Sequence, residues 1–321
     1  MKICYVVHRY APFPGGSENY VRDMAEETLK RGHEVAVFAG EHKGDLNGVR
    51  VSSDAQILLE KWDLIVVHGG DVGLQNFVLQ NAKNIPSPIM YMLILPSNNP
   101  IPVQALKDVK YIACSTNADW DHVEKYGVKD KAVQVNHGID FRSSLGTFGF
   151  REKYGIKQTK MFLSCGGYWP NKAMGELSDM FNDMKLEDSV LVLTGYDNRN
   201  NLMPKETEYV KPFLIDDRAD VMSAIKESDL YILHSYSEGF GLVLLESMLN
   251  NTPWAARHIA GAASMHNNGF TYTTNEELKN YLQNYQGVDF DKRVHNMGFV
   301  MDNHLISNTV DGILSVVNPT I

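Results

Sequence analysis

The stretch from Leu230 to Pro253 constrains the fold of this chain more than any other. The apolar run Leu230–Leu233 predicts a buried strand. The glycines at 239 and 241 predict a tight turn after that strand, because glycine in a helix interior costs about 1 kcal/mol relative to alanine. We expect a helix from Leu242 to about Asn250, ended by Pro253. A strand, a glycine turn and a helix form the repeating unit of open α/β sheets.

Two glutamates eight positions apart, Glu238 and Glu246, stand on either side of this turn. A glycine turn at a helix N-terminus presents unpaired backbone N–H groups and the positive end of the helix dipole, which favours binding of a phosphate. Glu246 falls in a helix that is apolar nearly all round, so its carboxylate needs partners, such as ligand hydroxyls, to offset desolvation. A purely structural interpretation is also open at this point: Glu238 would be a solvated loop residue and Glu246 would lie on an exposed helix edge.

Apolar strand-like runs alternate with helical segments along the whole chain. The run Lys2 to Val7 is followed by a loop with Gly15 and Gly16, a helix and a second strand, which is a βαβ opening. Because the loop is not a G-x-G-x-x-G, it gives little support to dinucleotide binding. A second α/β series starts after residue 150, and a chain of 321 residues has the length of about two domains. The sequence therefore predicts two doubly wound α/β domains joined near residues 141–147.

Composition excludes several classes of protein. A net charge of −9 argues against a protein whose affinity comes mainly from neutralising nucleic-acid phosphates. The three cysteines lie in or beside apolar strand-like runs and lack zinc-ligand spacing, which predicts reduced thiols in a cytoplasmic protein and no metal site. The apolar runs are far shorter than the ~20 residues that span a bilayer, so we expect no transmembrane segment.

Two segments resemble a known family. SYSEGFGLVLLESMLNNTP resembles the E-x7-E signature of retaining, GT4-type nucleotide-sugar glycosyltransferases, and PFPGGSE with RGHEV resembles their N-terminal pattern. The resemblance implies a GT-B fold, with two Rossmann-like domains facing a central cleft and a C-terminal helix that crosses back to the first domain. The expected domains are 1–142 with 302–321 on the acceptor side, and 150–301 on the nucleotide-sugar side.

The resemblance also implies roles for particular residues. Glu238 would contact the transferred sugar and Glu246 the ribose hydroxyls. His68 is the nearest substitute for a catalytic histidine that many family members carry after a later strand. The family's phosphate-binding arginine is replaced by Gly167, so Arg218 or Arg257 is a candidate to assist the lysine at 172. The implied donor-binding residues are Gly15, Gly16, Lys172, Gly239, Phe240, Gly241, Leu242 and Glu246.

The function that the resemblance implies is transfer of a sugar from a nucleotide-diphosphate sugar to an acceptor hydroxyl, with retention and without a metal or a further cofactor. The acceptor is open: a glycan, a lipid, a metabolite or a hydroxymethylated DNA base, the last being the single role left for nucleic acid. Two alternatives stay open as well. One is a nucleotide-sugar epimerase of GT-B fold, and the other is a degenerate sugar-nucleotide-binding protein. The sequence predicts no oligomeric state.

Overall fold

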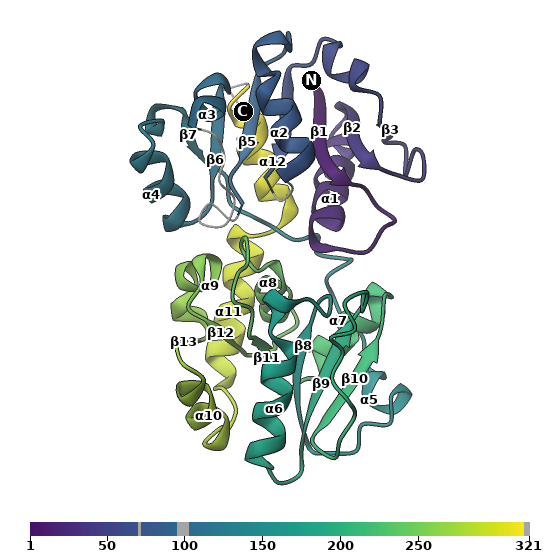
Figure 1. Cartoon of the computed structure of the whole chain (residues 1–321), viewed down its shortest axis with the longest axis vertical. Helices are drawn as coiled ribbons and strands as arrows, with labels where there is room; N and C mark the ends of the chain where they lie inside the picture. Colours follow the sequence, from purple (N-terminus) through teal and green to yellow (C-terminus); the bar gives the residue numbers. More distant parts are fainter. Residues whose placement is uncertain (70–71, 95–102, 318–321) are drawn as a thin grey trace. The chain divides into compact units, whose positions relative to one another are not determined.

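The computed structural model describes residues 1–69, 72–94 and 103–317. The chain divides into two compact units, which we describe separately (Figure 1). Unit 1 comprises Met1–Asp140 and His304–Ile321, and unit 2 comprises Phe141–Asn303. Residues 96–100, whose prolines at 96 and 100 predict the end of a strand, lie outside the described residues.

Unit 1 is built on a parallel sheet with the strand order β3-β2-β1-β4-β5-β6-β7. Its strands are β1 (Lys2–Arg9), β2 (Glu34–Glu41), β3 (Arg50–Ser52), β4 (Leu64–His68), β5 (Ile89–Met92), β6 (Tyr111–Cys114) and β7 (Ala132–Gln134). Its helices are α1 (Gly16–Lys30), α2 (Val72–Gln80), α3 (Val103–Asp108), α4 (Asn117–Lys125) and α12 (Ile306–Ser315). The order turns back between β1 and β4, and ligands of open α/β sheets bind at the carboxyl ends of the strands at such a switch point.

The C-terminal helix α12 packs against α1, although the two are far apart in sequence (Figure 1). Arg31 at the end of α1 pairs with Asp311 at 2.5 Å and donates to the carbonyl oxygen of Ser307. Beside it, Ile139 and Leu305 form a parallel bridge. The predicted return of the C-terminal helix to the first domain is therefore confirmed.

Unit 2 contains a second parallel sheet, with the strand order β10-β9-β8-β11-β12-β13. Its strands are β8 (Lys160–Cys165), β9 (Ser189–Gly195), β10 (Val210–Leu214), β11 (Leu230–Leu233), β12 (Trp254–Arg257) and β13 (Phe270–Tyr272). Its helices are α5 (Phe150–Lys153), α6 (Met174–Met184), α7 (Arg218–Glu227), α8 (Leu242–Leu249), α9 (Ala260–Ser264), α10 (Asn275–Gln283) and α11 (Phe290–Asn303). The switch point lies between β8 and β11. The expected α/β fold with two doubly wound sheets is confirmed.

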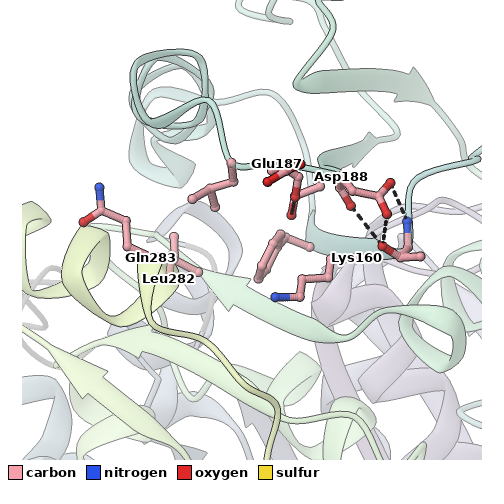
Figure 2. A pocket seen from close by; sticks show the side chains of 9 residues that line it. Lys160, Glu187, Asp188, Leu282 and Gln283 are labelled. Atoms are coloured by element: carbon pink, nitrogen blue, oxygen red, sulfur yellow. Dashed lines mark hydrogen bonds between the residues drawn. The ribbon is translucent and has the colours of Figure 1, made fainter.

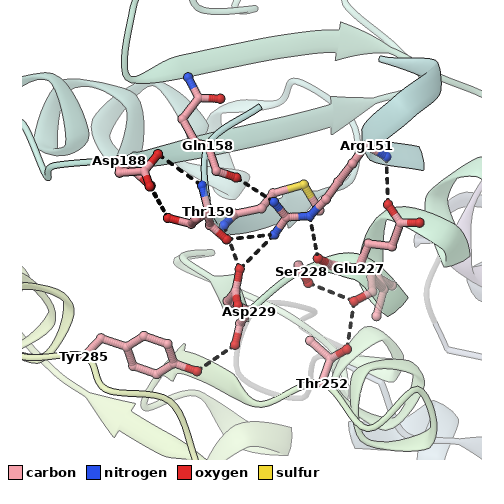
Figure 3. Close-up of polar contacts among 11 residues, drawn as sticks. Arg151, Gln158, Thr159, Asp188, Glu227, Ser228, Asp229, Thr252 and Tyr285 are labelled. Carbon is pink, nitrogen blue, oxygen red and sulfur yellow. Dashed lines mark hydrogen bonds and ion pairs between the residues drawn. The ribbon is translucent and has the colours of Figure 1, made fainter. Parts of the chain in front are cut away.

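Polar contacts secure the amino ends of the strands in unit 2 (Figure 3). Arg151 of α5 pairs with Asp229 at 2.9 Å and donates to the carbonyl oxygen of Gln158. The same Asp229 carboxylate accepts from the backbone N–H of Met161 at the start of β8. We interpret this network as structural, because it lies at the amino ends of the strands, whereas ligands of open α/β sheets bind at the carboxyl ends.

Candidate active site

Two loops meet at the switch point of unit 2. The loop after β8 covers residues 166–172, and the loop after β11 covers residues 234–241. The backbone N–H of Tyr236 donates to the carbonyl oxygen of Asn171 at 2.8 Å. Lys172 and Glu238 form an ion pair with Nζ and Oε1 2.5 Å apart. Their side chains are 17% and 15% exposed, so the pair is partly shielded from water and still reachable by a ligand.

Glu246 has a cationic partner within the protein. Its Oε1 lies 2.7 Å from Nη2 of Arg218, the first residue of α7. Glu246 is buried in α8, among apolar residues such as Leu245 and Met248, and a carboxylate in such surroundings requires a cation or hydrogen bonds. The structure thus places Arg218 beside the carboxylate, whereas the sequence suggested it as a phosphate ligand.

The thiol of Cys165, at the end of β8, lies among both ion pairs. Burial raises the pKa of this thiol to about 12, with Glu246 acting in the same direction and Lys172 and Arg218 opposing it. All three charged side chains are therefore close enough to the end of β8 to influence one group. We refer to these two ion pairs, Lys172–Glu238 and Arg218–Glu246, together as the charged cluster.

The helix N-terminus between the two glutamates has the geometry that the sequence predicted. Gly241 precedes α8 with a φ of 85°, a left-handed conformation that favours glycine, and Leu242 is the first helical residue. Phe240 is buried, and Gly239 lies in the bend before it. The first turn of α8 therefore starts at Leu242, separated from Glu238 by the residues of the 239–241 turn, and its N–H groups lie at the carboxyl end of the sheet.

Gly261 in α9 supports this turn by close backbone contact. A Cβ at this position would overlap the carbonyl oxygen of Phe240. We expect Gly261→Ala to lower the free energy of unfolding by about 1–3 kcal/mol and to weaken ligand binding at α8, because the 239–241 turn must shift. The measurement is thermal unfolding of the variant with and without nucleotide. Gly298→Ala, in a helix where an added Cβ meets nothing within 4 Å, is the matched control and should be neutral or stabilising.

A second polar cluster, around Glu176, lies beside the loop after β11. Arg257 pairs with Glu176 at 2.8 Å and donates to the carbonyl oxygen of His234. Burial opposes ionisation of Glu176, but hydrogen bonds from Tyr236 and Asn275 and the nearby His234 hold its pKa at about 2. Arg257, suggested from the sequence as a phosphate ligand, therefore anchors the loop through Glu176.

The residues expected from the first half of the chain lie at the switch point of unit 1. Gly15 caps α1 with a φ of 152°, and a Cβ there would overlap the carboxylate of Glu18. Glu18 is buried and pairs with Arg9 at 2.6 Å. Gly16 opens α1, with nothing within 4 Å of an added Cβ. This loop is therefore fixed by Glu18 and open at Gly16.

His68 is the last residue of β4. This strand pairs with β1, which leads into the loop of Gly15 and Gly16. It is 5% exposed and packs edge-on against Tyr20, whose hydroxyl bonds with Nδ1 of His137 at 2.8 Å. Burial, and then the neighbouring His137, lower the pKa of His68 to about 3. The imidazole is therefore neutral at physiological pH and a weak base.

The predicted site residues thus fall into two sets. Gly15, Gly16 and His68 belong to unit 1, and unit 2 brings together Lys172, Gly239, Phe240, Gly241, Leu242, Glu238 and Glu246. Within the part of the chain that the structure describes, no group of three or more metal-ligating side chains occurs. No helix among the same residues has the length and apolar character needed to cross a membrane.

A hollow of about 400 Å³ lies elsewhere in unit 2 (Figure 2). Its lining includes Lys160 and Ser189, the first residues of β8 and β9, and Leu282 at the end of α10. It therefore lies at the amino ends of the strands, opposite the charged cluster, and is not part of the candidate site.

Comparison with solved structures defines the class of fold. Anabaena Alr3699/HepE, solved with UDP and glucose, has a TM-score of 0.76 at 18% identity over 99% of this chain and 100% of its own. Sucrose-phosphate synthase from Thermosynechococcus elongatus has 0.76 at 13% identity, with 100% and 99% covered. WaaG, a glycosyltransferase involved in lipopolysaccharide biosynthesis, has 0.70 at 16% identity, with 98% and 99% covered. The fold is GT-B, as predicted.

Unit 2 contains the part of the chain that matches a family model. Residues 148–284 match the model described as glycosyl transferases group 1. A search of curated proteins finds no match to the chain. The matched residues contain both glutamates and both of their cationic partners. The match to group 1 glycosyl transferases and the GT-B fold thus agree, and the resemblance predicted from the motifs is confirmed for residues 148–284.

Proposed function

We propose that the charged cluster of unit 2 binds the donor, a nucleoside diphosphate sugar. Glu246 receives the ribose hydroxyls, and Glu238 contacts the sugar that is transferred. Lys172 and the first turn of α8 neutralise the diphosphate, in the manner of helix N-termini that bind phosphates. The observation that carries this proposal is the pairing of each glutamate with one cation, on either side of the glycine-capped N-terminus of α8.

The Lys172–Glu238 pair suits an exchange of partners. In the free protein the ammonium neutralises the carboxylate, so neither charge is left unpaired in a partly shielded site. When a diphosphate arrives, Lys172 turns to the phosphate oxygens, and the oxygens of Glu238 become acceptors for sugar hydroxyls. One lysine thus serves the free and the bound state, which offsets the absence of an arginine at Gly167.

In the reaction, the acceptor hydroxyl attacks the anomeric carbon while the bond from that carbon to the phosphate oxygen breaks. The proton of the hydroxyl passes to the departing phosphate oxygen. The nucleoside diphosphate leaves with the electron pair, and Lys172 with the α8 N-terminus stabilises its charge. Glu238 stabilises the oxocarbenium-like transition state from its place in the turn. We assign it no covalent bond to the sugar.

We propose that unit 1 serves the acceptor, with the loop of Gly15 and Gly16 open at Gly16 for close backbone approach. For His68 we propose a hydrogen-bonding role in place of general base, because its low pKa makes it a poor proton acceptor. The acceptor hydroxyl belongs to a glycan, a lipid or a metabolite. A modified DNA base is least favoured, since the chain carries a net charge of −9.

The test is a thermal-unfolding screen with UDP, GDP, ADP, CMP and TDP and their sugars. UDP comes first, because Anabaena Alr3699/HepE was solved with it. A nucleotide that binds the native state alone, at a hundred times its dissociation constant, stabilises by about 2.7 kcal/mol. We expect one nucleotide to raise the unfolding temperature, and Glu246→Ala to abolish the rise.

Turnover of the donor then separates the alternatives. Slow hydrolysis of the donor sugar by the purified protein supports the transferase. Interconversion of free donor sugars would indicate the epimerase, and binding without turnover across an acceptor panel would indicate the degenerate binding protein. An unchanged unfolding temperature with every nucleotide would contradict the proposed donor site.

A further inference from the structure

Arg218 connects the proposed ribose site to the segment at which the chain enters unit 2. Its Nη2 donates to Glu246 at 2.7 Å and to the hydroxyl of Ser144 at 3.0 Å. Its Nε donates to the carbonyl oxygen of Ser143 at 3.0 Å. One guanidinium therefore bonds both the carboxylate in α8 and the entry segment, which we define as residues 143–146.

Asn250, at the end of α8, holds the same segment from the other side. Its Nδ2 donates to the carbonyl oxygen of Ser144 at 2.7 Å, and its Oδ1 accepts from the backbone N–H of Gly146 at 2.7 Å. The Nδ2 group also donates to the carbonyl oxygen of Glu246. Ser144 is fully buried, so the entry segment packs against the end of α8 at this residue.

The backbone of the entry segment also approaches α7 closely. A Cβ at Gly146 would overlap the carbonyl oxygen of Met222. The segment is thereby confined between α7, which begins with Arg218, and α8, which carries Glu246. A change in the Arg218–Glu246 pair therefore acts directly on the backbone at 143–146.

The ion pair with Arg218 determines the position and orientation of the Glu246 carboxylate. Glu246 is 8% exposed, and a charge-assisted hydrogen bond in such a setting is about twice as strong as a neutral one. The planar guanidinium fixes direction as well as charge, because its donors lie in a rigid fork. The carboxylate oxygen that Arg218 holds is therefore fixed in place.

We propose that Arg218 is a positioning residue for donor recognition. It orients Glu246 toward the ribose, and its hydrogen bonds to Ser143 and Ser144 transmit ribose binding to the entry segment. This rests on the proposed function, in which Glu246 binds the ribose. Hydrogen bonds from ribose hydroxyls to Glu246 complete its set of partners and tighten the Arg218 contacts. The donor thus orders residues 143–146 without touching them.

The first experiment is a double-mutant cycle on UDP affinity, measured by calorimetry with Arg218→Gln, Glu246→Gln and the double variant. We expect Arg218→Gln to weaken UDP binding roughly tenfold, the loss typical of a hydrogen bond to a charged group. In the Glu246→Gln background, the same change should have little further effect. An undiminished further loss would mean that Arg218 contacts the donor directly and would overturn the proposal. Unchanged UDP affinity in Glu246→Gln would instead refute the ribose site itself.

The second experiment follows amide hydrogen exchange in a peptide covering 141–149. UDP should slow exchange there in the wild type, but much less in Arg218→Gln and in Ser144→Ala, which keeps the Glu246 pair and loses one bond to the segment. Equal UDP-dependent protection in all three proteins would overturn the proposal. Arg218→Lys, which keeps the charge and lacks the fork, should restore part of the affinity and little of the protection. This variant and Ser144→Ala keep the test valid where Arg218→Gln unfolds.

Discussion

Replacing Glu238 by alanine is expected to abolish sugar transfer while the protein stays folded. Its carboxylate is partly exposed in a loop, so the fold does not depend on it, whereas the proposed transition state does. Removing one group that stabilises developing charge costs about 10²–10³-fold in kcat. The measurement is the initial rate of donor turnover at saturating donor, with the unfolding temperature recorded for each variant.

Glu246→Ala is the matched variant, because Glu246 is proposed to bind the part of the donor that does not react. We expect it to raise the KM for the donor far more than it lowers kcat, which is the signature of lost uniform binding. The two variants should therefore separate in kcat and KM. If either variant has an activity comparable with that of the wild-type protein, the assignment of the two glutamates is refuted.

Local patterns predicted the elements that position the site. The end of α8 follows from Pro253, and its start from the conformation of Gly241, both of which are properties of the residues themselves. The β12 strand directly after Pro253 and the three-residue β13 were not foreseen, because such short strands are defined by the neighbours with which they pair. The order of strands in each sheet is likewise a property of the whole chain.

The partners of the glutamates depended on contacts distant in sequence. Arg218 is 28 residues from Glu246 and Arg257 is 81 residues from Glu176, so no periodicity connects them. A usable signal existed, because a carboxylate inside an apolar helix requires a cation, and Arg218 begins the helix before β11. The motif instead directed attention to the phosphate, and so the pairing of Arg218 with Glu246 was not foreseen.

Acidification is expected to destabilise the protein strongly between pH 6.5 and pH 4. His68, His137 and His234 are buried, and burial is the main cause that lowers the pKa of His68 and His137 to about 3 and of His234 to about 4. In the unfolded chain each titrates near its ordinary value of about 6.5. Below that pH the unfolded state binds more protons than the folded state, so stability falls as pH falls.

The expected size follows from the same pKa values. At pH 5 each buried histidine contributes a loss of about 2 kcal/mol, since one pKa unit corresponds to about 1.36 kcal/mol. Three such losses sum to about 6 kcal/mol, which is comparable with the 5–15 kcal/mol of a typical domain. His68 and His137 belong to unit 1 and His234 to unit 2, so unit 1 should lose more stability. Urea unfolding at pH 7.5, 6 and 5, followed by a probe in each unit, measures this.

Single-site variants assign the loss to particular side chains. His68→Gln removes one titrating group, so unfolding of unit 1 should depend less steeply on pH, whatever the variant does to stability at pH 7.5. His295→Gln, at an exposed position in α11, is the control and should leave the slope unchanged. Stability that stays constant from pH 7 to pH 5 would contradict the prediction. An imidazole resonance of His68 that titrates near pH 6.5 in the folded protein would also contradict it. In that case burial would not lower the pKa of this ring, and His68 would contribute no pH-dependent loss of stability.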